Sequence, residues 1–246
     1  MFAFLKNHPF AVEAFFESSI VLTYAVPKEQ IQHMIPPCLT LDTYKDNWAF
    51  VAVAMVQTNA LRPKLFPKFM GHNFFLVGYR IFVRYTNNAG KRLRGLYIIK
   101  SETNKKRMQL LGNIFTKYSY TTTDIIQTIT PSGKTIQSAK SGLLVEISST
   151  NNAISLPANS PFNDWAEARR FSGPLPFTFS YNEKTNEVLI VKGIRENWQP
   201  TPVKVIRHHV EFLTSLNLQN LQLASAFMVS NIPYSWQKGK TEIWNG

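Results

Sequence analysis

The sequence predicts a mainly β protein, an antiparallel barrel or cone with a few short flanking helices. Runs of β-branched and aromatic residues recur along the chain, turn signals separate them, and they outnumber the helical patterns. A closed or nearly closed sheet accommodates so many strands because it leaves few unpaired edges. Since no linker or repeat divides the 246 residues, we expect a single domain over 1–246.

Strand patterns dominate the first 100 residues. The run at 48–56, WAFVAVAMV, is apolar throughout, which predicts a strand buried on both faces. The sequence NNAG at 87–90 is a turn signal that joins the last two strands as a hairpin. The expected strands are 18–26, 48–56, 73–85 and 94–100.

Three segments have helical patterns. In the first, Pro27 suits the first turn and Pro36 ends the helix. The second is amphipathic, is loosened by Gly112 and ends beside Lys117. In the third, Asn163 is the expected N-cap. The expected helices are 27–37, 103–118 and 163–171.

Further strand patterns follow residue 120. The first three are polar, and a loop at 151–162 separates them from the later, more apolar ones. The expected strands are 121–130, 134–140, 142–150, 177–181, 187–193, 203–213 and 223–230.

The charge of the chain is strongly positive and unevenly distributed. Lys and Arg total 27 against 15 Asp and Glu, a net charge of +12, which favours anionic partners in general. No acid occurs between Asp46 and Glu102, so the cations there form a solvated basic face, or one or two of them point inward and hold an anionic ligand. These cations are Arg62, Lys64, Lys68, Arg80, Arg84, Lys91, Arg92, Arg94 and Lys100.

The sequence lacks the motifs that are typical of several kinds of functional site. Cys38 is the only cysteine, so an internal disulfide is excluded and a cytoplasmic location is expected. The neighbours His208 and His209 would point to opposite faces of a strand, which disfavours a metal site. Without a Walker loop, dinucleotide fingerprint or nucleophile elbow, we expect no cofactor. Apolar runs are far shorter than the ~20 residues of a spanning helix, and we expect no membrane partner.

Lys117 is a candidate nucleophile because of its neighbours in GNIFTKYSY, residues 112–120. Desolvation among Phe115, Tyr118 and Tyr120 would lower the pKa of its amine. A neutral amine is the nucleophile that Schiff-base chemistry requires. In the alternative interpretation, the methylenes of Lys117 cover apolar surface while its ammonium reaches water.

The order of several segments resembles the acetoacetate decarboxylase-like superfamily, and within it an uncharacterised bacterial branch. VPKEQIQHMIPPCLTLDTYKDNWAFVAVAM is similar to the opening of that branch, and VGYRIFVRY to its arginine-bearing strand. EARRF, WQP and IPYSWQKGKTEIW are similar to three later elements. The resemblance implies a β-cone or barrel with a small-molecule cavity, and it identifies Arg80 with the family arginine.

The same resemblance implies a catalytic lysine, although the sequence differs from the family at nearby positions. IFTK at 114–117 is similar to the decarboxylase segment whose lysine forms the substrate imine, which implies Lys117 as the Schiff-base residue. The second lysine of that segment is Tyr118 here, no carboxylate stands near Phe66 where the family has a glutamate, and Glu17 takes the place of an arginine.

Three functional hypotheses follow. The first is a cation-lined cavity for a small carbonyl or carboxylate compound, with Lys117 catalytic in a decarboxylase- or aldolase-like lyase reaction and Arg80, Phe115 and Tyr118 binding the substrate. The second is a non-catalytic binding module on the same fold. The third is polyanion binding through the basic surface, although no nucleic-acid-binding motif accompanies the charge. A homo-oligomer is compatible with all three.

Overall fold

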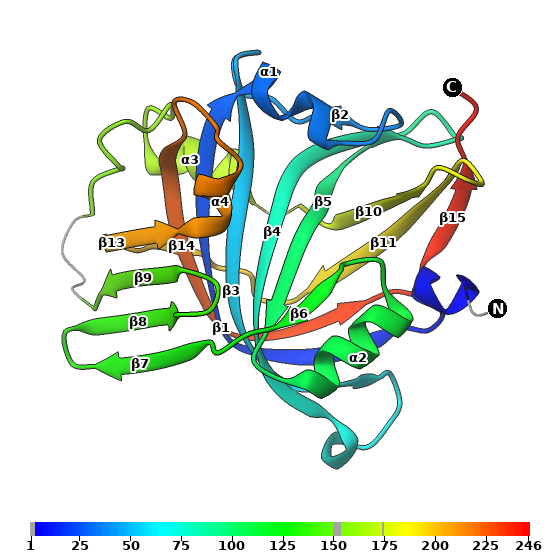
Figure 1. Ribbon diagram of the computed structural model, residues 1–246, viewed down its shortest axis with the longest axis horizontal. Helices are drawn as coiled ribbons and strands as arrows, with labels where there is room; N and C mark the ends of the chain where they lie inside the picture. The colour runs from blue at the N-terminus through cyan, green and yellow to red at the C-terminus, as the bar shows by residue number, and fades with distance from the viewer. Residues whose placement is uncertain (1–2, 150–153, 174) are drawn as a thin grey trace.

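The computed structural model describes residues 3–149, 154–173 and 175–246 (Figure 1). Their main feature is an 11-stranded sheet with the strand order β12-β14-β1-β3-β4-β5-β10-β11-β15, from which β2 and β6 branch. Because β11 also pairs with β14, the pairings from β14 through β1, β3, β4, β5 and β10 to β11 return to their start. The predicted mainly β class is confirmed.

The eleven strands of this sheet differ in length. Their bounds are β1 Val12–Pro27, β2 Thr40–Leu41, β3 Trp48–Pro63, β4 His72–Thr86, β5 Arg92–Thr103, β6 Tyr120–Thr122, β10 Phe177–Asn182, β11 Glu187–Arg195, β12 Thr201–Pro202, β14 Gln222–Trp236 and β15 Lys240–Ile243. All the pairings of this sheet are antiparallel except β5 with β10 and β5 with β6, which are parallel. The expectation of an antiparallel sheet therefore holds for most neighbours but not for these two.

A second, four-stranded sheet has the order β13-β9-β8-β7. Its strands are β7 Ile126–Thr130, β8 Gly133–Ser138, β9 Leu143–Ser148 and β13 Val205–Val210. Apolar side chains of this sheet, such as Ile136 and Val145, join the main core. The expected strand 142–150 ends in residue 150, and the expected loop 151–162 begins in residues 151–153, which lie outside the described residues.

The helices are short and differ in part from the expectation. Their bounds are η1 Ala3–Asn7, α1 Lys28–Ile31, η2 Gln32–Met34, η3 Lys68–Met70, α2 Lys106–Phe115, α3 Trp165–Ser172 and α4 Glu211–Ser215. The expected helix 27–37 is instead a turn of α-helix followed by a 3₁₀ turn, and it ends at Met34. The expected strand 203–213 ends at Val210, where α4 begins.

The N-cap of α3 is Asp164, so the prediction of Asn163 was wrong by one residue. The Asp164 carboxylate accepts a hydrogen bond from the amide of Glu167 at 2.7 Å, and the Glu167 carboxylate accepts one from the amide of Asn163 at 2.7 Å. This arrangement resembles a capping box, except that the Glu167 carboxylate accepts from the residue before the N-cap, and it satisfies two amides at the start of the helix.

The main sheet is apolar on both faces. One face of β1, β3 and β4 belongs to the largest core cluster, which also contains residues of the second sheet and of α4. On the other face, Phe50, Ala52 and Phe82 pack with Phe162 and Ala168 of the α3 region. The expected burial of residues 48–56 on both faces is confirmed for residues 49–56, all of which are buried.

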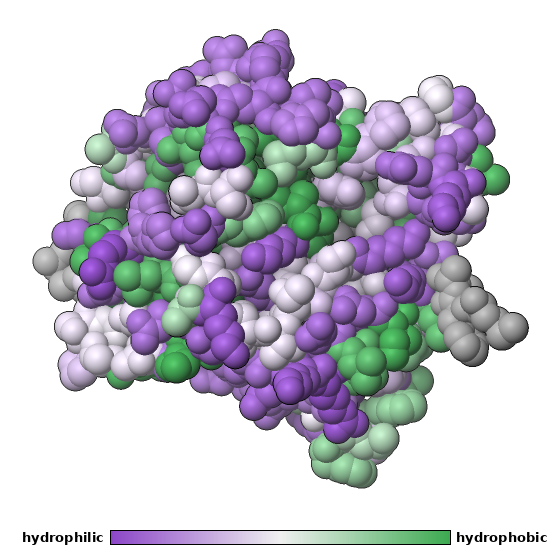
Figure 2. Space-filling view, in the orientation of Figure 1, coloured by the Kyte–Doolittle hydropathy of each residue, from purple (hydrophilic) through white to green (hydrophobic). Residues whose placement is uncertain are grey.

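Hydrophilic side chains cover much of the view in Figure 2, and a projecting hydrophobic tip marks the loop between β3 and β4. Within the described part of the chain, no helix has the length and apolar character needed to span a membrane.

Candidate anion-binding site

Arg80 lies on the face of β4 that packs towards α3. Across the sheet, Thr23 of β1 is the register partner of Ala52 of β3, and Ala52 is the partner of Arg80. In the next row, Ala54 is the partner of Gly78. Thr23 and Arg80 are thus two strand spacings, or about 10 Å, apart, and the guanidinium of Arg80 lies over Gly78.

The acid-free stretch of the sequence contains nine cations, and the structure divides them into three groups. Arg62, Arg84 and Arg94 form ion pairs with Glu13 and Asp42 from other segments, and Lys100 forms one with Glu102 of its own strand. Lys64, Lys68, Lys91 and Arg92 are exposed. Among the described residues, Arg80 alone of the nine is neither exposed nor ion-paired, and its Nε has no hydrogen-bond partner.

The surroundings of Arg80 are dry and aromatic. Burial lowers the pKa of its guanidinium, and the nearby positive charge of Arg195 acts in the same direction. The hydroxyls of Tyr234, Tyr120 and Tyr118 act in the opposite direction. A buried cation surrounded by neutral hydroxyls rather than carboxylates favours the binding of an anion.

Tyr118 and Tyr120 are both buried and enter this region from the loop after α2. Burial raises the pKa of both phenols, that of Tyr120 to about 12. The loop is fixed locally by Asn113, whose side chain donates to the carbonyl of Tyr120 at 2.9 Å and accepts from its amide at 2.8 Å. Both phenols are therefore neutral hydrogen-bonding groups near Arg80.

A second arginine, Arg195, lies near Arg80. The guanidinium of Arg195 lies 4.5 Å from the ring of Trp198 and 5.4 Å from that of Tyr234, and its Nη2 donates to the carbonyl of Leu175 at 3.0 Å. Arg195 Nε and Trp198 Nε1 have no hydrogen-bond partner among the residues that the structure describes. Trp198 and Tyr234 stand in the sequence only as parts of family-like segments, and Arg195 gives no sequence signal, because β11 meets β14 only in the folded sheet.

A small pocket of about 40 Å³ opens at Trp198, and neither Arg80 nor Arg195 is among its described lining residues. By the usual measure it holds about three water molecules. Thr23 Oγ1, Ser172 Oγ and Trp198 Nε1 belong to its lining residues and have no hydrogen-bond partner in the described part of the chain. The exposed Arg169 lies at the same pocket. A ligand of more than a few atoms fits only if a lining side chain such as Trp198 moves.

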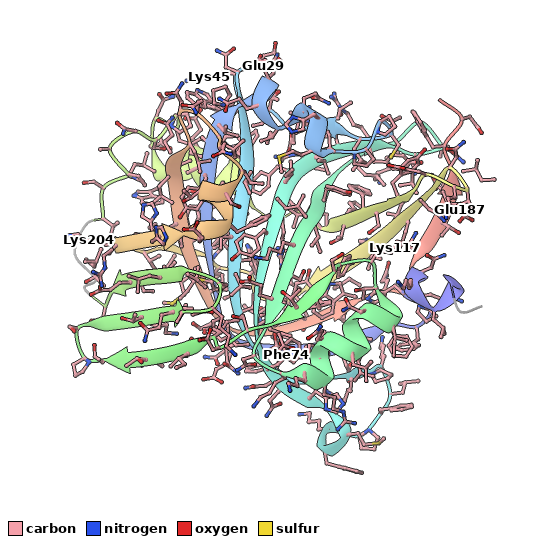
Figure 3. The ribbon with its side chains drawn as sticks, viewed as in Figure 1. Glu29, Lys45, Phe74, Lys117, Glu187 and Lys204 are labelled. Carbon is pink, nitrogen blue, oxygen red and sulfur yellow. The ribbon has the colours of Figure 1, made fainter. Side chains whose placement is uncertain are left out.

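Lys117 lies elsewhere, in the loop that follows α2 (Figure 3). It lines an open groove of about 410 Å³ together with Lys6, Asn113, Thr116, Ser119, Tyr120 and Thr121. Burial lowers the pKa of its half-buried amine, the charge of Glu187 raises it, and that of Lys6 lowers it. Among the described residues, no carboxylate forms an ion pair with Lys117.

The predicted site residues thus fall into two places. Arg80 and Tyr118 lie together inside, whereas Lys117 lines the groove. Phe115 packs edge-to-face on Phe10 with ring centroids 5.1 Å apart. Tyr120 is near Arg80 and also lines the groove, so it connects the two places. In the described residues, no three side chains of His, Cys, Asp and Glu gather as a metal site requires.

A protein-family model, DUF2071, described as "uncharacterized conserved protein", matches residues 14–238. No curated protein matches the sequence of the chain.

Solved structures with the same fold include an acetoacetate decarboxylase from Legionella pneumophila, with a TM-score of 0.62 and 10% identity over 95% of this chain and 88% of that one. An acetoacetate decarboxylase-like enzyme from Sphingomonas wittichii RW1 has a TM-score of 0.58 and 10% identity over 97% and 94%. The enduracididine biosynthesis enzyme MppR, complexed with pyruvate, has a TM-score of 0.54 and 9% identity over 95% and 90%. The acetoacetate decarboxylase-like fold predicted from the sequence is confirmed.

Proposed function

The chain belongs to the DUF2071 family, and we propose that it binds a small carboxylate or carbonyl compound, with Arg80 as the anchor of the anion. The observation that carries this proposal is the buried guanidinium of Arg80, which no carboxylate balances among the described residues. An uncompensated cation inside a protein costs stability, and an anionic ligand would remove that cost.

The chemistry around Arg80 suits a carboxylate. A guanidinium binds the two oxygens of a carboxylate through parallel hydrogen bonds. The neutral hydroxyls of Tyr118 and Tyr234 can donate to a ligand oxygen, and Arg195 adds a second positive charge. The small pocket favours a compact ligand, and MppR, which has the same fold, is complexed with pyruvate.

A thermal-shift titration tests the binding. Pyruvate, acetoacetate and other short oxo acids should stabilise the wild-type protein, by about 2.7 kcal/mol at a ligand concentration 100 times Kd. The variant Arg80→Met should lose that response, whereas Arg92→Met, which changes an exposed arginine on the neighbouring strand, should keep it. An equal response in both variants would exclude Arg80 as the anchor.

A second candidate function is imine formation at Lys117. Its supporting observation is the amine itself, whose pKa is lowered by burial and which has no carboxylate partner in the described residues. The neutral amine would attack the carbonyl carbon of an oxo acid, and loss of water would leave a C=N bond. The groove of about 410 Å³ that Lys117 lines has the volume of ordinary ligand pockets.

Borohydride trapping tests this step, since hydride addition to the C=N bond gives a stable secondary amine that adds mass. Lys134 is a matched control, because burial also lowers the pKa of its amine but it lies far away in sequence on β8. The expected result is one adduct with pyruvate or acetoacetate that persists in Lys134→Ala and disappears in Lys117→Ala. Ligand stabilisation without an adduct would leave the protein a binding module.

A further inference from the structure

The loop between β3 and β4 exposes an unusual set of apolar side chains. Leu65 and Phe69 are 91% and 88% exposed, and Phe66 and Met70 are each 48% exposed. Large apolar side chains that are almost fully exposed and adjacent are uncommon on proteins that contact only water. This set of four residues is called the apolar tip below. Figure 1 shows the loop projecting from one end of the molecule, beyond α2.

The loop holds its apolar tip outward by specific contacts at its base. Arg62 donates from Nε to the carbonyl of Phe66 at 2.8 Å and from Nη1 to that of Ala60 at 2.9 Å, and it is ion-paired with Glu13. The amide of Lys64 donates to the carbonyl of Ala11 at 2.9 Å. These contacts order the base of the loop, so little conformational entropy remains to be lost when the tip meets a partner.

Leu65 itself has a φ of 77°, in the region that favours glycine. A bulky residue is held in this conformation only where its surroundings require it, and such strain is often found at functional positions. In this conformation the Leu65 side chain is nearly fully exposed, so the unfavourable backbone conformation does not improve packing within the molecule.

The surroundings of the apolar tip are positively charged. Lys64 and Lys68 alternate with its apolar residues, and both are exposed. Lys105, Lys106 and Arg107, at the start of α2, are exposed as well. Burial lowers the pKa of His72, just after the loop, and the charge of the nearby Arg107 lowers it further. Figure 2 shows hydrophilic surface beside the projecting hydrophobic tip.

An apolar tip surrounded by lysine and arginine is complementary to an anionic bilayer. Leucine and phenylalanine enter the boundary between head groups and acyl chains, while the long basic side chains remain among the anionic head groups. A protein interface would more commonly offer a flat or concave surface, in which core residues are packed and desolvated. The projecting shape therefore favours a deformable lipid partner over a rigid protein.

We propose that the β3–β4 loop, residues 63–71, docks this protein reversibly on anionic membranes by inserting its apolar tip between lipid head groups. The expectation of no membrane partner depended on the lack of a spanning segment, which an inserting loop does not need. This proposal is independent of the ligand proposed for Arg80. The membrane-binding surface requires only the loop and the adjacent start of α2.

Vesicle co-sedimentation with the full chain tests the proposal. Binding should be measured on phosphatidylcholine vesicles with and without phosphatidylserine, at low and high salt. Wild-type protein should bind the anionic vesicles, and salt should weaken binding. The double variant Leu65→Ser/Phe69→Ser should reduce partitioning more than tenfold. Replacing Lys64 and Lys68 by Ala should reduce it roughly fivefold for each lysine.

Matched controls distinguish an effect specific to the loop from a general effect of exposed apolar surface or positive charge. Ile126 and Ile129 of β7 are 56% and 66% exposed, so Ile126→Ser/Ile129→Ser removes comparable apolar surface elsewhere and should leave binding unchanged. Lys140→Ala/Lys184→Ala removes two exposed lysines outside the loop and should have a smaller effect than the loop variant. Equal losses in loop and control variants would overturn the proposal.

Insertion can be measured directly with Phe69→Trp. Brominated lipids should quench the new tryptophan in anionic vesicles, which surface adsorption alone does not cause. Light scattering of the same variants tests a protein partner instead. If wild-type protein forms a dimer that Leu65→Ser/Phe69→Ser dissociates, and vesicles do not bind, the tip is an interface between two copies and the membrane proposal is wrong.

Discussion

The guanidinium of Arg80 folds back over Gly78, two residues earlier on the same strand. A Cβ atom built on Gly78 would lie 3.0 Å from Arg80 Nε and 3.1 Å from its Nη2, closer than ordinary van der Waals contact. The glycine therefore provides the space in which the proposed anion anchor rests. In the sheet, Gly78 has Ala54 as its partner on one side, which adds to that space.

Gly78→Ala should weaken ligand binding with little effect on stability. The new methyl group meets only the mobile end of the Arg80 side chain, so the guanidinium shifts by a few tenths of an ångström and its hydrogen bonds to a carboxylate become poorer. We expect affinity for the stabilising oxo acid to fall about fivefold to tenfold. Unfolding free energy should change by less than about 1 kcal/mol. Calorimetric titration and urea unfolding measure the two quantities, and unchanged affinity would contradict the role of the glycine.

Arg80→Met should stabilise the ligand-free protein. Methionine fills similar space without the desolvation cost of a buried, unpaired guanidinium. The expected gain in unfolding free energy is about 0.5–2 kcal/mol, at the expense of ligand binding. Chemical denaturation without ligand measures it, and a clear loss of stability would mean that Arg80 has a structural partner.

Arg84→Met should have the opposite effect, although Arg84 lies four residues further along the same strand. Arg84 is ion-paired with Asp42, whose side chain is fully buried. Its loss leaves that carboxylate with Arg94 as its remaining cation. We expect unfolding free energy to fall by about 1–3 kcal/mol. The contrast between the two methionine variants distinguishes a structural arginine from a ligand-binding one in one denaturation experiment.

Acid should destabilise the protein through His8. This side chain is 7% exposed, and burial lowers its pKa below the ordinary value of 6.5, partly offset by a backbone hydrogen bond at Phe10. As the pH falls through 6.5, the unfolded chain takes up a proton at this residue before the folded protein does. Unfolding free energy should therefore decline below pH 6.5, by at most about 1.4 kcal/mol per pH unit for this one group.

The variant His8→Asn isolates that contribution. Asparagine tolerates the positive φ of 54° at this position, so the fold is retained while the titrating group is removed. Urea unfolding between pH 8 and pH 5 should show a shallower decline in the variant. His33→Asn, at an exposed position, is the control and should keep the wild-type slope. The pKa values of His72 and His208 are also lowered by burial, so some decline should persist.

Gly95→Ala should disrupt the sheet where β5 and β10 run parallel. A Cβ at Gly95 would collide with the carbonyl oxygen of Phe177 and lie 2.7 Å from the ring of Phe179. Because a backbone atom cannot move aside as a side chain does, we expect a loss of about 2–3 kcal/mol. Thermal unfolding measures it. Gly173→Ala is the control, since its added Cβ would make only ordinary contacts at 3.6 Å or more.

Local patterns predicted much of the fold because they reflect short-range physics. The apolar run 48–56 predicted burial on both faces, and the turn at 87–90 predicted the hairpin of β4 and β5. The predicted strands were too short at polar ends such as residues 57–63 of β3. These residues pair with β1 and β4, and pairing between distant strands leaves no local apolar signal.

The candidate site was only partly visible in the sequence. An acid-free stretch with nine cations left two alternatives, a solvated basic face or one or two cations that point inward. Arg80 points inward without a carboxylate partner in the described residues. Arg62 and Arg84 looked equivalent to it in sequence, and they differ because Glu13 and Asp42 reach them through strand pairing. Lys100 differs because its partner Glu102 lies two residues further along the same strand.

The sequence by itself determined the mainly β class, the order of its strands and helices and the excess of positive charge, because residue preferences and composition act locally. Only the tertiary structure decided which cation lacks a counter-charge, which tyrosines approach it, and that Lys117 lines a groove while Tyr118 is buried inside. Those properties depend on strand register and on the meeting of β11 with β14, where residues far apart in the chain become neighbours.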